Sequence, residues 1–126
     1  MTDTATCLAH AQELYQMLEQ NQMIEAIDRF YADDVEIIEA DGETARGKEA
    51  QKARCLEWLQ SIDTYHGGGV HAITSNEEAG VTMVESWSKM TFKGAPAPMN
   101  QDEVAVQHWK DGKIVRERFY YNAADA

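Results

Sequence analysis

The stretch from residue 30 to residue 51 constrains the fold of this chain more than any other part of the sequence. A helical pattern ends at YADD, and residues 35–40 then alternate as a short, half-buried strand does. Glu39 lies near the far end of that strand, and an Asp-Gly turn leads to Gly47, which opens another helical pattern. This order predicts an acidic side chain at the mouth or floor of a cavity between helices and a sheet.

Two runs of apolar residues at helical spacing precede this stretch and predict two helices joined by a short loop. The first run consists of Leu8, Ala11, Leu14, Tyr15 and Leu18. The second run consists of Met23, Ile24, Ile27, Phe30 and Tyr31. Asn21 lies between the runs, and we expect it to be the N-cap of the second helix.

A third helix is predicted over residues 48–61, after Gly47. Its expected apolar side is formed by Ala53, Leu56, Leu59 and Ile62. Three consecutive glycines at residues 67–69 are expected to stop this helix and to form a turn, because glycine tolerates unusual backbone conformations.

The second half of the chain has the alternation of strands, which we predict over residues 70–75, 81–92, 102–110 and 113–122. Residues 76–80 are a predicted turn, residues 93–98 are a loop with two prolines, and Asp111-Gly112 is a strong hairpin signal. Helices followed by antiparallel strands predict an α+β class, with helices on one face of a curved antiparallel sheet. The length of 126 residues fits a single domain over residues 1–126.

Charge and composition exclude several classes of function. The net charge of −11, without a basic stripe, excludes a nucleic-acid partner. The sequence contains no apolar run long enough to span a membrane and no secretory signal. Cys7 and Cys55 have neither metal-ligand spacing nor a disulfide framework, so we expect free thiols and a cytoplasmic protein. The sequence also lacks metal-binding and phosphate-binding motifs, so we expect no metal and no cofactor.

The order of a helix hairpin, YADD, a short strand, a glycine-led helix and hairpins ending in DGKIVRERFYYN resembles the nuclear-transport-factor-like cone fold. Within that superfamily the chain is most similar to the SnoaL-like group, which includes polyketide cyclases, and it is more distantly similar to ketosteroid isomerases. The resemblance implies three helices packed on a strongly curved sheet that encloses a conical cavity. The superfamily contains isomerases, dehydratases, cyclases, hydrolases and non-catalytic binding domains, so the fold does not define the function.

The resemblance places Glu39 at the position of the general base of the isomerases. The two oxyanion-stabilising positions of those enzymes fall near Gln16 and at Ala105, so this chain lacks that pair. Tyr15 is one residue away from the first position and is expected to point elsewhere on the helix. Steroid isomerisation by that mechanism is therefore disfavoured, whereas the SnoaL-like group implies acid/base help to an already acidic, ketone-type substrate.

Glu39 and Glu117 are the candidate catalytic residues. Glu39 shares a strand face with two aliphatic residues, whose desolvating effect would raise its pKa towards that of a general base. Glu117 shares a face with Phe119 and Tyr121 on the last strand, where an acid among apolar neighbours is unusual. If the two carboxylates approach each other, repulsion keeps one protonated and yields one acid and one base. The alternative for each is a structural salt bridge with an arginine or a solvated strand charge.

Candidate ligand-binding residues come from several elements. One strand face carries Glu103, Ala105, Gln107 and Trp109, and it is the expected cavity face. Gln107 would offer a hydrogen bond and Trp109 an aromatic wall, although core packing is the favoured alternative for Trp109. The remaining candidates for the cavity wall are Phe119, Tyr121, Trp58 and His71.

Two hypotheses of function remain open at this point. The first is a cofactor-independent cyclase or isomerase that moves a proton on a small apolar carbonyl compound. The second is a small-ligand-binding or dimerisation module without turnover. We also expect a homodimer, because Val104 and Val106 lie beside His108 on the sheet face opposite the helices.

Overall fold

The computed structural model describes residues 6–121, which form three helices and six strands. The helices are α1 (Cys7–Glu19), α2 (Met23–Phe30) and α3 (Lys48–Ser61). The strands are β1 (Tyr31–Ile38), β2 (Thr44–Arg46), β3 (Ile62–Asn76), β4 (Val81–Phe92), β5 (Met99–Lys110) and β6 (Lys113–Tyr121). The predicted α+β class is confirmed.

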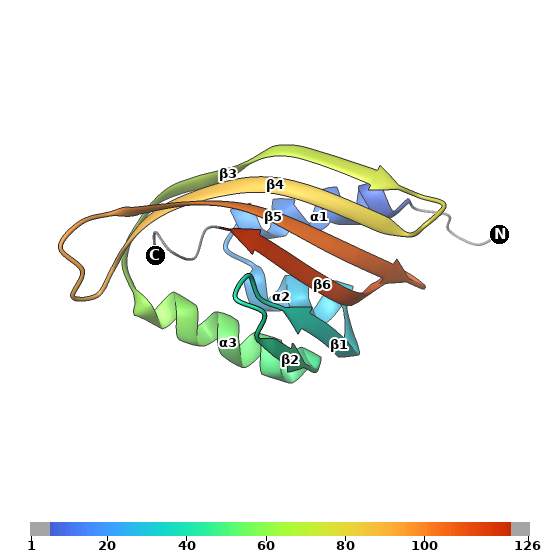
Figure 1. Cartoon of the computed structure of the whole chain (residues 1–126), viewed down its shortest axis with the longest axis horizontal. Helices are drawn as coiled ribbons and strands as arrows, with labels where there is room; N and C mark the ends of the chain where they lie inside the picture. Colours follow the sequence, from blue (N-terminus) through green and yellow to red (C-terminus); the bar gives the residue numbers. More distant parts are fainter. Residues whose placement is uncertain (1–5, 122–126) are drawn as a thin grey trace.

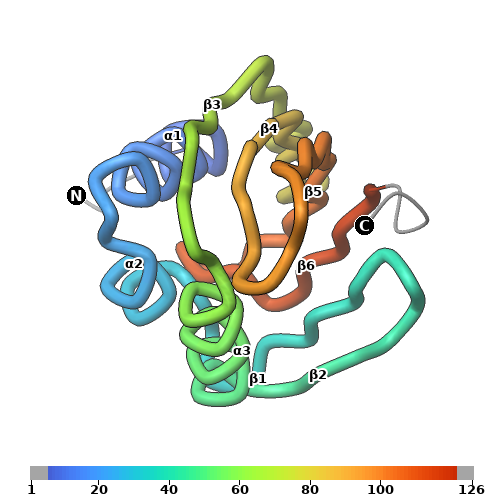
Figure 2. Tube along the Cα trace, turned by 90° about the vertical axis from the view of Figure 1, so that its left-hand side faces the viewer, coloured from blue at the N-terminus to red at the C-terminus, as the bar shows by residue number. Residues whose placement is uncertain are grey.

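The six strands form one open, bent sheet in the order β2-β1-β6-β5-β4-β3 (Figure 1). Most neighbours are antiparallel as expected, but β1 pairs with β6 in parallel, so the sheet is mixed. Register pairs Ile37 with Glu117 across this parallel junction. In the view of Figure 2 the three helices lie along one side of the bent sheet.

The link between α1 and α2 differs in detail from the prediction. Thr6 caps α1, because its hydroxyl accepts a hydrogen bond from the backbone N–H of Ala9 at 3.0 Å. The N-cap of α2 is Gln22, and Asn21 instead adopts a φ of 61° in the left-handed region. Asparagine tolerates this conformation better than most residues, so Asn21 turns the chain between the helices rather than capping α2.

The first strand begins earlier than expected. β1 starts at Tyr31, directly after α2, and ends at Ile38, so Glu39 lies just beyond the strand rather than within it. The predicted Asp-Gly turn is present, and the backbone N–H of Gly42 donates to the carbonyl of Glu39 at 2.9 Å. The chain then returns as the short strand β2, which the sequence did not predict and which pairs antiparallel with β1.

Helix α3 has the predicted bounds, but only Leu59 and Ile62 of its expected apolar side line the pocket. Leu56 and Leu59 are 45% and 41% exposed, and Ala53 is exposed as well. The side that faces the interior carries Gln51, Arg54, Cys55, Trp58 and Leu59. Their spacing is also helical, and the helix covers a pocket lined by both polar and apolar side chains rather than a solid apolar core, so polar residues can face inward.

The glycine triplet does not form the predicted turn. Residues 67–69 lie inside β3, which follows α3 immediately and pairs with β4. Aromatic side chains occupy the space that side chains at these positions would need. A Cβ on Gly69 would lie 3.1 Å from the indole nitrogen of Trp87, and a Cβ on Gly68 would collide with the hydroxyl of Tyr65. The glycines therefore permit close aromatic packing against the strand.

Strand β4 and the turn between β5 and β6 agree with the prediction from the sequence. β4 has the predicted bounds, and its alternation is confirmed, with Val84 and Met90 buried and Met83 exposed. At the β5–β6 turn, Asp111 and Gly112 have φ values of 53° and 76°, as a type I′ hairpin turn requires.

The main core lies where α1 and α2 pack against β1, β5 and β6. Its buried residues are Ala11, Leu14, Ala26, Ile27, Phe30, Tyr31, Val35, Ile37, Trp109 and Ile114. Phe30 and Trp109 meet edge to face, with ring centroids 6.0 Å apart. None of the helices within residues 6–121 is both long enough and apolar enough for a membrane span.

Candidate functional site

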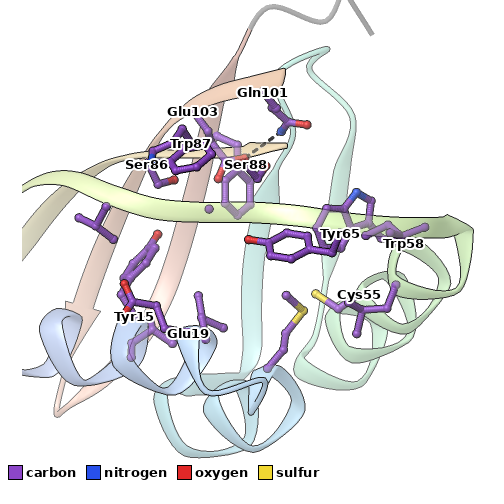
Figure 3. A pocket seen from close by; sticks show the side chains of 18 of the residues that line it. Tyr15, Glu19, Cys55, Trp58, Tyr65, Ser86, Trp87, Ser88, Gln101 and Glu103 are labelled. Atoms are coloured by element: carbon purple, nitrogen blue, oxygen red, sulfur yellow. Dashed lines mark hydrogen bonds between the residues drawn. The ribbon is translucent and has the colours of Figure 1, made fainter. Parts of the chain in front are cut away.

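A pocket of about 1120 Å³ lies between the helices and the bent sheet. Figure 3 shows how its labelled side chains come from α1, α3 and the strands β3 to β5, with Tyr15 and Glu19 on α1 and Cys55 and Trp58 on α3. The end of β1 and the inner face of β6 complete the lining with Glu39, Glu117, Phe119 and Tyr121. The pocket thus brings together side chains that are far apart in the sequence.

Glu117 is the most deeply buried acid of this pocket, with an exposure of 1%. The hydroxyl of Tyr31 donates a hydrogen bond to Oε1, and Nε2 of Gln107 donates to Oε2 at 2.8 Å. Burial raises the pKa of Glu117 to about 7 and Glu39 adds to the rise, while the two hydrogen bonds oppose it. Glu117 therefore changes its charge near neutral pH.

A chain of hydrogen bonds orients the amide that holds Glu117. The indole N–H of Trp109 donates to the hydroxyl of Thr82 at 2.8 Å, and this hydroxyl donates to Oε1 of Gln107 at 2.6 Å. With its oxygen occupied, Gln107 turns its N–H₂ group toward Glu117. The prediction placed Gln107 and Trp109 at the pocket wall, but Trp109 belongs to the core and Gln107 is fully buried behind Glu117.

Tyr15 faces the pocket, contrary to the expectation that it points elsewhere. Nε2 of Gln107 donates to its hydroxyl oxygen at 3.3 Å. Because Gln107 is the donor in this contact, the phenolic proton stays available to the pocket. Burial and the nearby Glu117 raise the pKa of Tyr15 well above its usual value, so the hydroxyl remains a donor at neutral pH.

Glu39 lines the pocket and forms an ion pair. Nη2 of Arg54 lies 2.6 Å from its Oε1, and the hydroxyl of Tyr121 donates to Oε2 at 3.4 Å. Arg54 projects from α3, and Glu39 follows the end of β1. The structure thus contains the arginine partner that the sequence left as the alternative to a free base.

Glu103 is a third pocket carboxylate, to which the sequence assigned a face but no role. It lies on β5, paired in register with Ser86 on β4 and Tyr121 on β6. Its hydrogen bond from Nε2 of Gln101 is long, at 3.4 Å (Figure 3). Burial, followed by the charges of Glu117 and Glu39, raises the pKa of Glu103 to about 7. The alternation with Ala105 and Gln107 was the signal that could have identified it.

Three of the other four predicted ligand-binding residues line the pocket, and one lies outside it. Trp58, Phe119 and Tyr121 line the pocket, as expected. His71 is exposed and lies outside the lining. It is the extra residue of a bulge in β3, where Val70 pairs with Ser86 and Ala72 already pairs with Glu85. This bulge breaks the alternation on which the prediction depended.

Within residues 6–121, no group of three or more His, Cys, Asp or Glu side chains is arranged to hold a metal ion. Cys7 and Cys55 are free thiols, and Cys55 lines the pocket. Burial and the charges of Glu117 and Glu39 raise the pKa of Cys55 to about 11. Its thiol is therefore protonated at neutral pH and is poorly suited to act as a nucleophile.

The helices over a bent open sheet, with a pocket between them, define an α+β domain of the nuclear-transport-factor-like type. Residues 5–121 match the family model described as the SnoaL-like domain, and the chain belongs to this family. A comparison with curated proteins finds no significant match.

Three solved structures illustrate the range of proteins to which the chain is similar. A candidate SnoaL-like polyketide cyclase from Mesorhizobium loti is 29% identical, with a TM-score of 0.80 over 93% of this chain and 100% of that chain. A candidate polyketide cyclase from Pseudomonas putida is 18% identical, with a TM-score of 0.79 over 96% and 95%. An epoxide hydrolase of M. tuberculosis is 18% identical, with a TM-score of 0.72 over 94% and 84%.

Proposed function

We propose that this protein is a cofactor-independent enzyme that transfers a proton within a small apolar carbonyl compound bound in the pocket. The observation that carries this proposal is the position of Glu117, which lines the pocket, is held by Tyr31 and Gln107 and has a pKa of about 7. A general acid or base works best when its pKa lies near the working pH. The sequence favoured Glu39 as the base, but its carboxylate is paired with Arg54, so Glu117 is the stronger candidate.

In the proposed reaction, the carboxylate of Glu117 removes a proton from the carbon next to the carbonyl group. The electron pair of the broken C–H bond moves to the carbonyl oxygen and forms an enolate. Tyr15 donates a hydrogen bond to that oxygen, which stabilises the developing charge. Glu117 then returns the same proton to the substrate at another atom or after ring closure, so the reaction requires no oxidant and no cofactor.

The neighbours support this class of chemistry. Two of the similar structures are described as candidate polyketide cyclases. The lining of the pocket is also suited to an apolar molecule, since Trp58, Phe119 and Tyr121 provide aromatic walls. We include a cytoplasmic location in the proposal, and the free thiols of Cys7 and Cys55 support it.

The second candidate is a binding module without turnover, and the ion pair between Glu39 and Arg54 is the observation that favours it. This pair is the structural arrangement that a carboxylate adopts when it supports a fold rather than takes up protons. A binding module would retain the aromatic walls and would use Glu117 and Gln107 only to hold the sheet together.

Deuterium exchange into 2-tetralone distinguishes the two candidates. The ketone is incubated with the protein in D₂O at pH 7.5, and loss of the protons next to its carbonyl is followed by nuclear magnetic resonance. An enzyme should accelerate the exchange, and Glu117→Gln should reduce the acceleration by about a hundredfold or more. Glu57→Gln is the matched control, because this glutamate of α3 is exposed and lies outside the pocket lining. If 2-tetralone binds but its exchange matches the protein-free rate, the binding module is the correct reading.

A further inference from the structure

The lining of the pocket is strongly acidic within the part of the chain that the structure describes. It carries five carboxylates, Glu19, Glu39, Asp63, Glu103 and Glu117, and one guanidinium, that of Arg54. Arg54 is already engaged by Glu39 at 2.6 Å. Glu19 and Asp63 are exposed to water, and Glu117 accepts hydrogen bonds from Tyr31 and Gln107. A purely apolar neutral ligand would therefore leave Glu103 poorly compensated, because a carboxylate removed from water is costly unless it is paired.

An independent observation on α3 also indicates a ligand that donates hydrogen bonds. Gln51 is 6% exposed and lines the pocket. Its Nε2 group contacts Sγ of Cys55 at 3.6 Å, whereas its Oε1 is a buried acceptor without a hydrogen-bond partner among residues 6–121. Buried amide oxygens are nearly always satisfied, so this oxygen calls for an N–H or O–H group from a bound molecule.

Aromatic side chains in the pocket offer a further means of binding a cation. Trp58 from α3, Tyr65 from β3 and Tyr121 from β6 line the pocket together with the acids. Tyr65 lies against the glycine triplet of β3, in the space that a side chain on Gly68 would occupy. The negative faces of such rings attract ammonium groups, and this attraction adds to that of the carboxylates.

From these observations we propose that the physiological ligand carries a protonated amino group on its apolar body. The carboxylate of Glu103 receives the ammonium group, the oxygen of Gln51 accepts from a second N–H or O–H group of the ligand, and the aromatic residues enclose the body. This inference rests on the proposed function in that both concern the same pocket, and it narrows the substrate to an amine-bearing carbonyl compound.

Calorimetric titration with three matched probes tests the inference. The probes are 2-phenylethylamine, 2-phenylethanol and 3-phenylpropanoate, which share an aromatic body and present a cation, a neutral hydroxyl and an anion. At pH 8 the amine is protonated and the pocket acids are largely ionised, so the amine should bind at least tenfold more tightly than the alcohol. The anion should bind most weakly.

Two variants identify which pocket residues contribute to the selective binding of the amine. Glu103→Gln should weaken binding of the amine about tenfold and leave binding of the alcohol nearly unchanged. Gln51→Met removes the unpaired oxygen at similar volume, so it should not lower the thermal midpoint of unfolding and should leave the preference for the amine over the alcohol unchanged. Glu57→Gln removes one negative charge outside the pocket and should have no effect on either probe.

The outcomes separate this inference from the proposed function. Equal affinity for the amine and the alcohol, or an equal effect of Glu103→Gln on both, would overturn the amine inference. The exchange of 2-tetralone is measured without any amine, so acceleration there would still support proton transfer. Conversely, strong selectivity for the amine without acceleration of exchange would support the inference and refute the proposed chemistry.

Discussion

The hydroxyl of Tyr31 donates a hydrogen bond to the carboxylate of Glu117 across 86 residues of sequence. Tyr31 is the first residue of β1, immediately after α2, and Glu117 is in the middle of β6. The contact spans the parallel junction of the sheet, and both residues line the pocket. The hydrogen bond therefore connects a residue of the hydrophobic core with the carboxylate whose protonation sets the charge of the pocket.

Tyr31→Phe should destabilise the protein more at pH 8 than at pH 5.5. At the higher pH the substitution leaves a buried charge with one fewer donor, which costs about 1–3 kcal/mol. At the lower pH Glu117 is protonated, and the loss should be nearer the roughly 1 kcal/mol of a neutral hydrogen bond. Urea unfolding at the two pH values measures the difference. An equal loss at both would show that Glu117 is not ionised in the folded protein at pH 8.

The free energy of unfolding should fall as the pH rises from about 4.5 to about 7. Glu103 and Glu117 both have a pKa of about 7 in the folded protein, against an ordinary value of 4.5. Between these values the folded state holds protons that the unfolded chain releases, so stability is greatest below the window and is lost through it. The slope is at most about 1.4 kcal/mol per pH unit for each group.

Substitution identifies the groups responsible for this pH dependence. The groups that act on Glu117 are Tyr31, Gln107 and Glu39, and those that act on Glu103 are Gln101, Glu117 and Glu39. Glu103→Gln should flatten the dependence of stability on pH between 4.5 and 7, whereas the exposed Glu57→Gln should not. An unchanged slope in Glu103→Gln would contradict the raised pKa of Glu103.

Glu39→Gln should reduce stability modestly, by about 1 kcal/mol, because Arg54 loses its ionic partner in a half-buried position. A double-mutant cycle with Arg54→Met isolates the interaction between the two side chains. If Glu39 also assists proton transfer, Glu39→Gln should slow the exchange of 2-tetralone. The exchange should stay slow, relative to the wild-type protein, at a lower temperature where the variant is fully folded. A coupling energy near zero would mean that the pair does not support the fold.

The outer face of the sheet leads us to predict a homodimer. Met83 and Tyr120 are exposed large apolar residues on β4 and β6, and Val104 and Val106 lie between them on β5. Apolar residues on an uncovered sheet face favour association. Light scattering at tens of micromolar should give twice the monomer mass, and Val106→Lys should give a monomer. A wild-type monomer at high micromolar concentration would refute the prediction.

Local sequence patterns determined several elements of this protein. The periodicity of α1, the bounds of α3 and β4, and the Asp111-Gly112 turn were all readable, because each depends on residues that are neighbours along the chain. The alternation of β6 also placed Glu117 on the same face as Phe119 and Tyr121, and all three line the pocket.

Tertiary structure alone decided which acids meet which partners. The pairing of Glu39 with Arg54 and the inward face of α3 depend on how α3 packs over the sheet, and the bond from Tyr31 to Glu117 depends on the parallel pairing of β1 with β6. No local period encodes that packing, because burial of a helix face is set by what lies opposite it. For the same reason the glycine triplet could be read as a turn, although close packing against Trp87 places it in a strand.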